Sequence, residues 1–376
     1  MNHQENQASN PASWAITDTD GSQRKYPEPQ HGYRSCFQRD RDRVAHCTAF
    51  RRLDFKTQVF VPHQHDHFRT RMTHTLEVAL IARTLGRALR LNEDLIEAVA
   101  LAHDLGHSPF GHGGEEILNK LMSRHGGFEH NRQSLRVVDY LEHPYPDFRG
   151  LNLTNVVREC IARHETAYDT PACPDFSDNL QAPLAGQVVD AADEIAYTSA
   201  DLEDALVSGC ISTQQLDELD LWHQAWDAAS KQYPNARKIH LRIRACKNVL
   251  EIMASDLLSA TVDRIEALGP GPTPDTIRHA ERKCAGFSEP LAPSISTLQK
   301  FLLHNVYTAG ENARRNAASQ QIIADLFARY LADESLLPDR YRRRIDQQGL
   351  HRVVCDFIAG MTDRYCTAQH AKVCLG

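Results

Sequence analysis

Helical spacing of apolar residues dominates this chain from residue 40 onward. Between residues 71 and 90, Leu76, Ala79, Leu80 and Leu85 recur every three to four positions with polar residues between them, as on one face of an α-helix. The same spacing indicates further helices at 115–124, 129–142, 153–164, 183–208, 213–231, 238–267, 295–306, 316–333 and 347–365. The sequence therefore predicts an all-α fold.

Capping and strand signals support that prediction. In "LNEDLIEAVALAHDLG", Asn92 is a candidate N-cap, acidic residues fill the first turn, and Gly106 follows the last turn. Strand signals are sparse: "TQVFV" at 57–61 is the best of them, and it is short. No internal repeat is present.

Stretches rich in Pro, Gly and Asp predict the loops and the domain boundaries. The expected loops are 142–152, 168–182 and 268–276, and the sharpest break is "LGPGPTP" at 268–274. The first 30 residues are rich in Asn, Gln, Ser and Pro. We expect three parts: a disordered or flexible arm at 1–30, a core at 31–267 and a C-terminal helical region at 268–376.

Composition argues against a nucleic-acid-coating, membrane-spanning or secreted protein. The 376 residues carry a formal net charge of −7, which argues against wholesale coating of nucleic acid, although basic clusters occur at 38–43, 50–52 and 340–344. No apolar run approaches the roughly 18 residues of a membrane span, and the polar N-terminus lacks the apolar core of a secretory signal. Ten cysteines without a CxxC pair predict reduced thiols in a cytoplasmic protein.

Histidines and carboxylates at helix-related positions predict a metal site. His74 begins one expected helix, and His103 with Asp104 ends the next. In the helix expected at 183–208, Asp193, Tyr197 and Asp201 fall four residues apart and share one face. A His-Asp pair alone carries little weight among 20 histidines, but the combination is unusual for mere packing. Such mixed ligands suit Mn, Mg, Fe, Co, Ni or Zn.

Several longer motifs resemble one family. They are "AFRRLDFKTQVF", "FRTRMTHTLEVA", "AHDLGHSPFGHGGEE", "GFEHNRQSLR", "VVDAADEIAYTSADLEDA" and "RVVCDFIAGMTDRY". Together they resemble the HD-superfamily deoxynucleoside triphosphate triphosphohydrolases, the dGTPase-like proteins, over residues from about 30 to about 370. The resemblance implies an HD-domain helical core, a homo-oligomer, and cleavage of a dNTP to deoxynucleoside and inorganic triphosphate. In some members a second dNTP acts as an activator.

The resemblance also implies roles for individual residues. The implied metal ligands are His74, His103, Asp104 and Asp193. His112 with Glu115 is the implied general acid and its carboxylate partner, in a segment that reads as a loop, and Glu116 is the competing carboxylate. His107 and His130 match catalytic positions near the phosphates. The implied substrate contacts are Arg71 with the phosphates, Gln58 with the sugar, Tyr197 with phosphates or sugar, and Asp201 with the 3′-hydroxyl.

Two other readings stay open at this point. One is a different HD-type nucleotide phosphohydrolase or phosphodiesterase that uses the same metal on another substrate. The other is an oligomeric dNTP sensor or nucleic-acid-binding protein with weak hydrolysis, motivated by "RYRRR" at 340–344.

Overall fold

The structure is a computed structural model that describes residues 11–59, 68–165, 176 and 178–375. Within these ranges the chain is helical and contains no β-strand, so the all-α prediction is confirmed. The only β-type pairings there are two isolated bridges, Arg24 with Thr154 and Thr57 with Thr70. Of the strand signal at 57–61, Thr57 thus makes a single bridge, and residues 60–61 lie outside the described ranges.

Contacts between Cα atoms divide the chain into two compact units. Unit 1 consists of Met1–Asp42, Leu76–Ala100 and Leu153–Ala309, and unit 2 consists of Arg43–Thr75, Leu101–Asn152 and Gly310–Gly376. Three helices pass from one unit into the other: α1 (Cys36–His46), α3 (Arg71–Ala88) and α4 (Glu93–Ala102).

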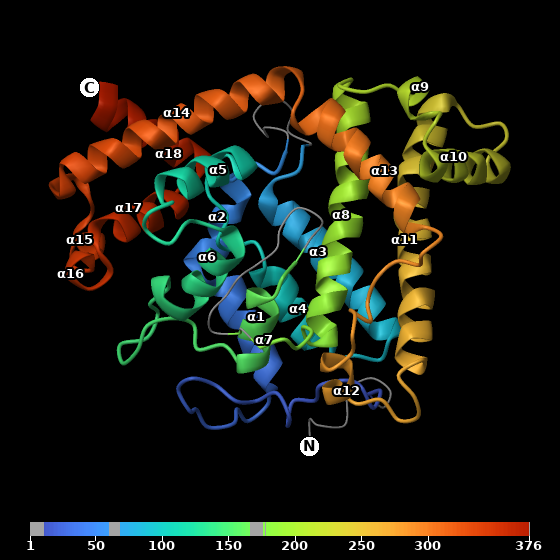
Figure 1. Cartoon of the computed structure of the whole chain (residues 1–376), viewed down its shortest axis with the longest axis horizontal. Coiled ribbons are helices and arrows are strands. Elements are labelled where there is room, and N and C mark those ends of the chain that lie inside the picture. Colours follow the sequence, from blue (N-terminus) through green and yellow to red (C-terminus); the bar gives the residue numbers. More distant parts are fainter. Residues whose placement is uncertain (1–10, 60–67, 166–175, 177, 376) are drawn as a thin grey trace. The chain divides into compact units, whose positions relative to one another are not determined.

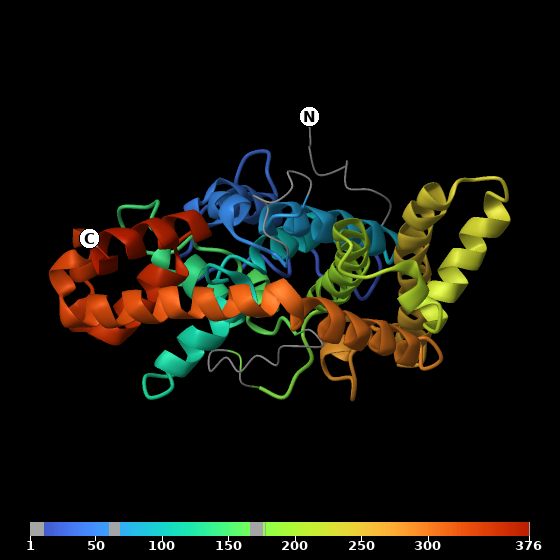
Figure 2. The ribbon, with the colours of Figure 1, turned by 90° about the horizontal axis from the view of Figure 1, so that it is seen from above.

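Helix α8 (Leu184–Ser208) is the centre of unit 1. It contacts α7 (Asn155–Ala162), α11 (Lys238–Glu266), α12 (Pro274–Arg278) and α13 (Ala292–Leu302). Because it is surrounded on most sides, α8 buries nearly every residue along its length. Helix α10 (Asp220–Gln232) follows α9 (Thr213–Leu216) and packs along α11, as the two views show (Figures 1 and 2). The π-helical turn η6 (Leu303–Tyr307) extends α13.

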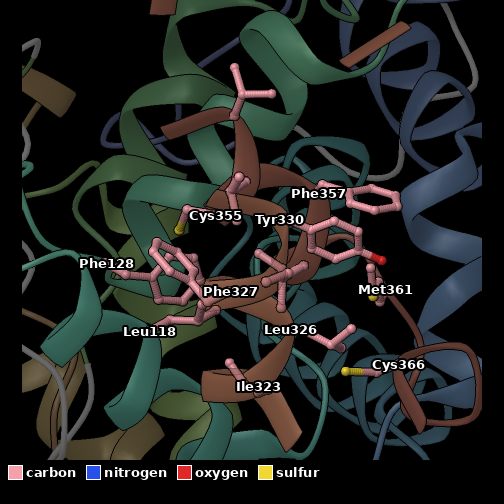
Figure 3. Packing of buried hydrophobic residues seen from close by; sticks show 14 of the residues in the cluster. Leu118, Phe128, Ile323, Leu326, Phe327, Tyr330, Cys355, Phe357, Met361 and Cys366 are labelled. Carbon is pink, nitrogen blue, oxygen red and sulfur yellow. The ribbon is translucent and has the colours of Figure 1, made fainter. Parts of the chain in front are cut away.

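Unit 2 is built on α14 (Gly310–Ala332), which contacts α5 (Gly111–Leu121), α17 (Leu350–Ala359) and α18 (Asp363–His370). Buried side chains from these helices form one apolar cluster, in which Leu118, Phe327, Tyr330 and Phe357 lie close together (Figure 3). The remaining elements of unit 2 are α2 (Thr48–Arg52), η2 (Leu53–Phe55), α6 (His130–Arg136), η4 (Val137–Leu141), η7 (Glu334–Leu336), α15 (Asp339–Arg342), α16 (Ile345–Gln348) and η8 (Ala371–Leu375).

Most expected helices are present, and the differences have local causes. Asn92 caps α4 as predicted, since its side-chain oxygen accepts the Leu95 N–H at 3.1 Å. The helix expected at 347–365 is two helices, because Thr362 caps a new one by accepting the Tyr365 N–H. Likewise the segment expected at 213–231 is α9 followed by α10. The helix expected at 115–124 begins four residues earlier, at Gly111.

Packing accounts for that early start of α5. A Cβ atom at Gly113 would lie 3.2 Å from Asn316 Oδ1 of α14, and one at Gly114 would lie 2.0 Å from Pro109 O and 3.1 Å from Ile323 Cδ1 of α14. Gly113 therefore lets α5 approach α14 closely, Gly114 lets the first turn of α5 lie against Pro109, and these contacts outweigh the poor helix propensity of glycine. The prediction that His112 sits in a loop is consequently wrong, because His112 lies on α5 together with Glu115.

Residues 11–30, which composition assigns to a flexible arm, make specific contacts within unit 1. The Trp14 indole N–H donates to Leu89 O at 3.2 Å, and Arg24 pairs with the buried Asp40 carboxylate. The proposed boundaries at 30/31 and 267/268 remain predictions. None of the helices in the described part of the chain is both long and apolar enough to cross a bilayer.

Candidate active site

Two imidazoles and one carboxylate meet inside unit 2. His74 lies in the first turn of α3, and His103 and Asp104 follow directly after α4. Their ligand atoms all lie within 4.8 Å of one another, and the three side chains are only 1–4% exposed. Burying a carboxylate is costly without a compensating positive charge. The donor set therefore fits a divalent metal ion of the kind that accepts mixed nitrogen and oxygen ligands.

Asp104 is held as an anion by its neighbours. Its Oδ2 accepts a hydrogen bond from Arg71 Nη1 at 3.0 Å, and its Oδ1 lies 3.2 Å from His107 Nε2. Burial alone would raise the pKa of Asp104, but the charges of His103, Arg71 and His107 outweigh it and hold the pKa well below its usual range. Arg71, expected only as a phosphate contact, thus also orients a candidate metal ligand.

Helix α6 fixes the turn that carries His103. The Ser134 hydroxyl donates to His103 O at 2.6 Å and accepts the Gly106 N–H at 2.8 Å. Gly106 lies so close to α6 that an added Cβ would stand 2.1 Å from Ser134 N and 2.3 Å from His130 O. Only glycine allows this approach. Gly106, which the sequence analysis places after the last turn of a helix, therefore also lets the turn with His103 and Asp104 pack against α6.

Beside the metal-type cluster, His107 and His130 stack with ring centroids 4.0 Å apart. Burial, together with the charges of Arg71 and His130, holds the pKa of His107 well below its usual range. Its Nδ1 is buried and has no hydrogen-bond partner among the described residues. A buried ring nitrogen without a partner is unusual in a folded protein and marks this point as a candidate contact for a polar ligand atom.

Glu115 is paired with His130, a contact that the sequence did not reveal. Its carboxylate accepts the His130 N–H at 2.8 Å and lies 3.0 Å from His130 Nδ1. The predicted partner, His112, is exposed in the first turn of α5, three residues before Glu115 on the same helix face, and its charge helps to lower the pKa of Glu115. The competing carboxylate Glu116 is exposed and accepts a hydrogen bond from Gln320 at 2.9 Å.

The lowered pKa of the Glu115 carboxyl implies that its contribution to stability depends on pH. Burial raises its pKa, but the charge and hydrogen bonds of His130 outweigh this and leave the pKa well below the usual value of 4.5. Because the folded pKa is depressed, the stabilisation is present above about pH 4.5 and is lost as the pH falls toward the folded pKa.

We expect Glu115→Gln to lower the unfolding free energy by about 1.5–3 kcal/mol at neutral pH, the range for hydrogen bonds to charged groups. Urea unfolding at pH 7 and pH 4 measures the difference in unfolding free energy between the wild type and Glu115→Gln. This difference should be smaller at pH 4. The matched variant Glu116→Gln should unfold like the wild type at both values. An equal loss for Glu115→Gln at the two values would contradict the pairing.

Lys56 and Gln58 precede α3 in unit 2, and Lys56 contacts this region. Lys56 is buried, and its ammonium donates to His107 O and, at 3.0 Å, to Ala359 O. Burial, reinforced by the charges of Arg52 and Arg71, lowers the pKa of Lys56 to about 7. Gln58 Oε1 is buried and accepts no hydrogen bond from the described residues. Lys56 thus supports the His107 turn.

In unit 1, Asp193 lies on α8 within a group of charged side chains. His164 Nδ1 lies 2.7 Å from Asp190 Oδ1, and its Nε2 lies 3.5 Å from Asp193 Oδ2. Lys283 pairs with Asp190 at 2.8 Å. Burial lowers the pKa of His164, but Asp190 and Asp193 outweigh it and raise the pKa to about 10. Nothing in the spacing of His164 distinguished it from other histidines.

Tyr197 and Asp201 lie one and two turns beyond Asp193 on α8, as expected, and both are buried. Each meets a residue of α13 or η6. The Tyr197 hydroxyl accepts a hydrogen bond from Gln299 Nε2 at 3.2 Å, and Asp201 Oδ2 accepts one from the Tyr307 hydroxyl at 2.5 Å. A substrate hydroxyl at Asp201 would share this carboxylate with Tyr307.

Comparison with known proteins gives family matches that include these residues. The HD domain family matches residues 71–198, which include His74, His103, Asp104 and Asp193, and the phosphohydrolase-associated domain family matches residues 285–372. A deoxyguanosinetriphosphate triphosphohydrolase-like protein of Geobacter sulfurreducens is 43% identical, covering 96% of this chain and 94% of its own. Proteins of the same description from Thiobacillus denitrificans and Bordetella pertussis are 43% and 42% identical, each covering 96% of both chains.

Proposed function

The chain belongs to the HD-domain family of deoxyguanosinetriphosphate triphosphohydrolase-like proteins, and from this premise we propose that it hydrolyses deoxynucleoside triphosphates to deoxynucleoside and inorganic triphosphate. The observation that carries the proposal is the buried cluster of His74, His103 and Asp104, next to the stacked His107 and His130. The site would thus combine metal ligands with further imidazoles for a phosphate-bearing substrate.

We propose that His74, His103 and Asp104 hold a divalent ion, drawn from Mn, Mg, Fe, Co, Ni or Zn. Asp193 keeps the role of fourth ligand that the family resemblance predicts. When bound, such an ion supplies Lewis acidity, which activates water and offsets negative charge on the α-phosphate. The hydrogen bond from Arg71 to Asp104 keeps that carboxylate ionised and oriented for this purpose.

His112 is the proposed proton donor. Cleavage at the α-phosphorus expels the 5′-oxygen of the nucleoside, which leaves badly unless it is protonated. His112 is exposed in the first turn of α5 and therefore accessible to a substrate, and the Glu115 carboxylate on the same helix face favours the charged imidazole. Arg71, His107 and His130 are the proposed phosphate contacts, and Gln58, Tyr197 and Asp201 are the proposed contacts to sugar and phosphate.

Replacing His112 by alanine should lower kcat for dNTP hydrolysis by about 10²- to 10⁴-fold, the usual contribution of a positioned general acid, with a smaller change in KM. A dNTP analogue with sulfur in place of the 5′-oxygen separates this role from a structural one, because a thiolate leaves without protonation. The defect of His112→Ala should shrink with that analogue, and exposed His143→Ala should match the wild type with both substrates. An equal defect with both substrates would remove His112 from the proton transfer.

The family resemblance also supports a homo-oligomer and, in some members, activation by a second dNTP. Both remain predictions for this chain.

A further inference from the structure

One carboxylate near the C-terminus binds the turn from which α5 begins. Asp363 is the first residue of α18, and its Oδ1 accepts the Phe110 N–H at 2.9 Å. Its Oδ2 accepts two hydrogen bonds from Thr57, one from the backbone N–H at 2.9 Å and one from the hydroxyl at 2.5 Å. All three residues belong to unit 2. Asp363 thus joins three segments that are far apart in the sequence.

The turn that Asp363 binds has a strained backbone. Phe110 has a φ of 64° and a ψ of 24°, and Gly111 after it has a φ of 61°. A residue with a Cβ atom rarely adopts this left-handed conformation, which persists only where surrounding contacts hold it. Phe110 is also the N-cap of α5, and its side chain makes no capping hydrogen bond. The hydrogen bond to Asp363 is therefore a contact that can hold this conformation.

A buried lysine ties the same turn to the same C-terminal segment. The Lys56 ammonium donates both to His107 O and to Ala359 O. The Arg52 guanidinium donates to Gly360 O at 2.9 Å. Residues 52–57 and 359–363 are thus bound to each other, and the turn at 107–111 is bound to both.

This turn lies between two residues of the proposed catalytic group. His107 is at its start, and His112 follows Phe110 by two residues, in the first turn of α5. The hydrogen bonds of Asp363 go to Thr57 and to the backbone of Phe110, so Asp363 can act on these imidazoles only through the main chain. The direction of the His112 side chain follows from where α5 begins, and small displacements of a reacting group are costly in catalysis.

We propose that Asp363 is a positioning residue for the reaction. By binding Phe110 and Thr57 it fixes the start of α5, and thereby the direction in which His112 meets the substrate. This role rests on the proposed function, in which His112 is the proton donor. Loss of the Asp363 carboxylate therefore impairs protonation of the leaving 5′-oxygen and leaves the metal-type cluster in place.

Hydrogen exchange followed by mass spectrometry tests the contact without requiring turnover. Asparagine has one acceptor oxygen, so in Asp363→Asn either Phe110 N or Thr57 N faces an amide NH₂ group. Peptides that contain residues 108–116 should exchange about tenfold faster than in the wild type, because a hydrogen bond to a charged acceptor is lost. Peptides from α8 should exchange as before. Asp339→Asn is the matched control, since Asp339 is the exposed first residue of α15 and pairs with Arg342.

Kinetics distinguish the positioning of His112 from a general loss of structure. Asp363→Asn should lower kcat for dNTP hydrolysis by about 10- to 100-fold with a smaller change in KM, the size of effect that a slight misplacement of a reacting group produces. The defect should shrink with the analogue that carries sulfur in place of the 5′-oxygen. In the double variant with His112→Ala, kcat should lie within about twofold of that of His112→Ala alone, because both changes act on one step. Bound divalent ion should match the wild type.

Thr57→Val is a milder variant that serves if Asp363→Asn does not fold, since it removes only the hydroxyl bond to the same carboxylate. It should show the same pattern, with kcat about two- to fivefold lower. Wild-type exchange of the 108–116 peptides in Asp363→Asn, equal defects with both substrates, or additive losses in the double variant would overturn the proposal. A wild-type chain that hydrolyses no dNTP would instead refute the proposed function, and the exchange measurement would still decide whether Asp363 holds the turn.

Discussion

Gly106→Ala is expected to lower the free energy of unfolding by about 3 kcal/mol or more, the upper range for overpacking a buried site. The added Cβ would stand 2.1 Å from Ser134 N, 2.3 Å from His130 O and 2.5 Å from Gln133 C. These are backbone atoms of α6, so no side-chain rotation relieves the clash. Either α6 or the turn that carries His103 must move.

The same displacement should damage activity. The Ser134 hydroxyl links Gly106 N to His103 O, and His130 belongs to the helix that would shift. Urea unfolding and dNTP turnover measure the two effects. Gly32→Ala is the matched control, because no atom lies within 4 Å of its added Cβ, and it should change stability by less than about 0.5 kcal/mol. Wild-type stability and turnover in Gly106→Ala would show that the turn is not docked on α6 as described.

Much of the fold could be predicted from local patterns in the sequence. Apolar spacing and the Asn92 cap predicted α3 and α4, and the placement of Asp193, Tyr197 and Asp201 on one buried helix was also predictable. These features depend on residues within a few turns of one another, so a single sequence reveals them. The all-α fold follows from the same signals.

Contacts between distant segments were not predictable in this way. The pairing of Glu115 with His130 joins two helices, and the first turn of α5 depends on the close contacts of Gly113 with α14 and of Gly114 with Pro109. His164 beside Asp190 and Asp193 likewise depends on packing within unit 1. Each case requires knowing which helix faces which, and apolar spacing does not specify that. Even so, Glu129, which caps α6 through its carboxylate, was a local sign that His130 begins a helix.

His103→Ala should reduce dNTP hydrolysis by about 1000-fold or more, because a metal ion contributes several kcal/mol to catalysis and each 1.4 kcal/mol is a factor of ten. His103 is 1% exposed, and its ligand nitrogen lies with those of His74 and Asp104 in one buried group. The fold should survive the change, since Asp104 keeps its contacts with Arg71 and His107. Circular dichroism checks the fold, and metal analysis should find less bound divalent ion. Exposed His143→Ala is the matched control and should behave as the wild type.

The identity of the products tests the central claim most directly. The purified wild-type chain and His103→Ala are incubated with Mn or Mg and each of the four dNTPs, singly and mixed, and the products are separated by anion-exchange chromatography. The proposed function predicts deoxynucleoside and inorganic triphosphate from the wild type and neither from His103→Ala. Release of orthophosphate, pyrophosphate or a nucleoside monophosphate instead, or turnover that His103→Ala retains, would contradict it.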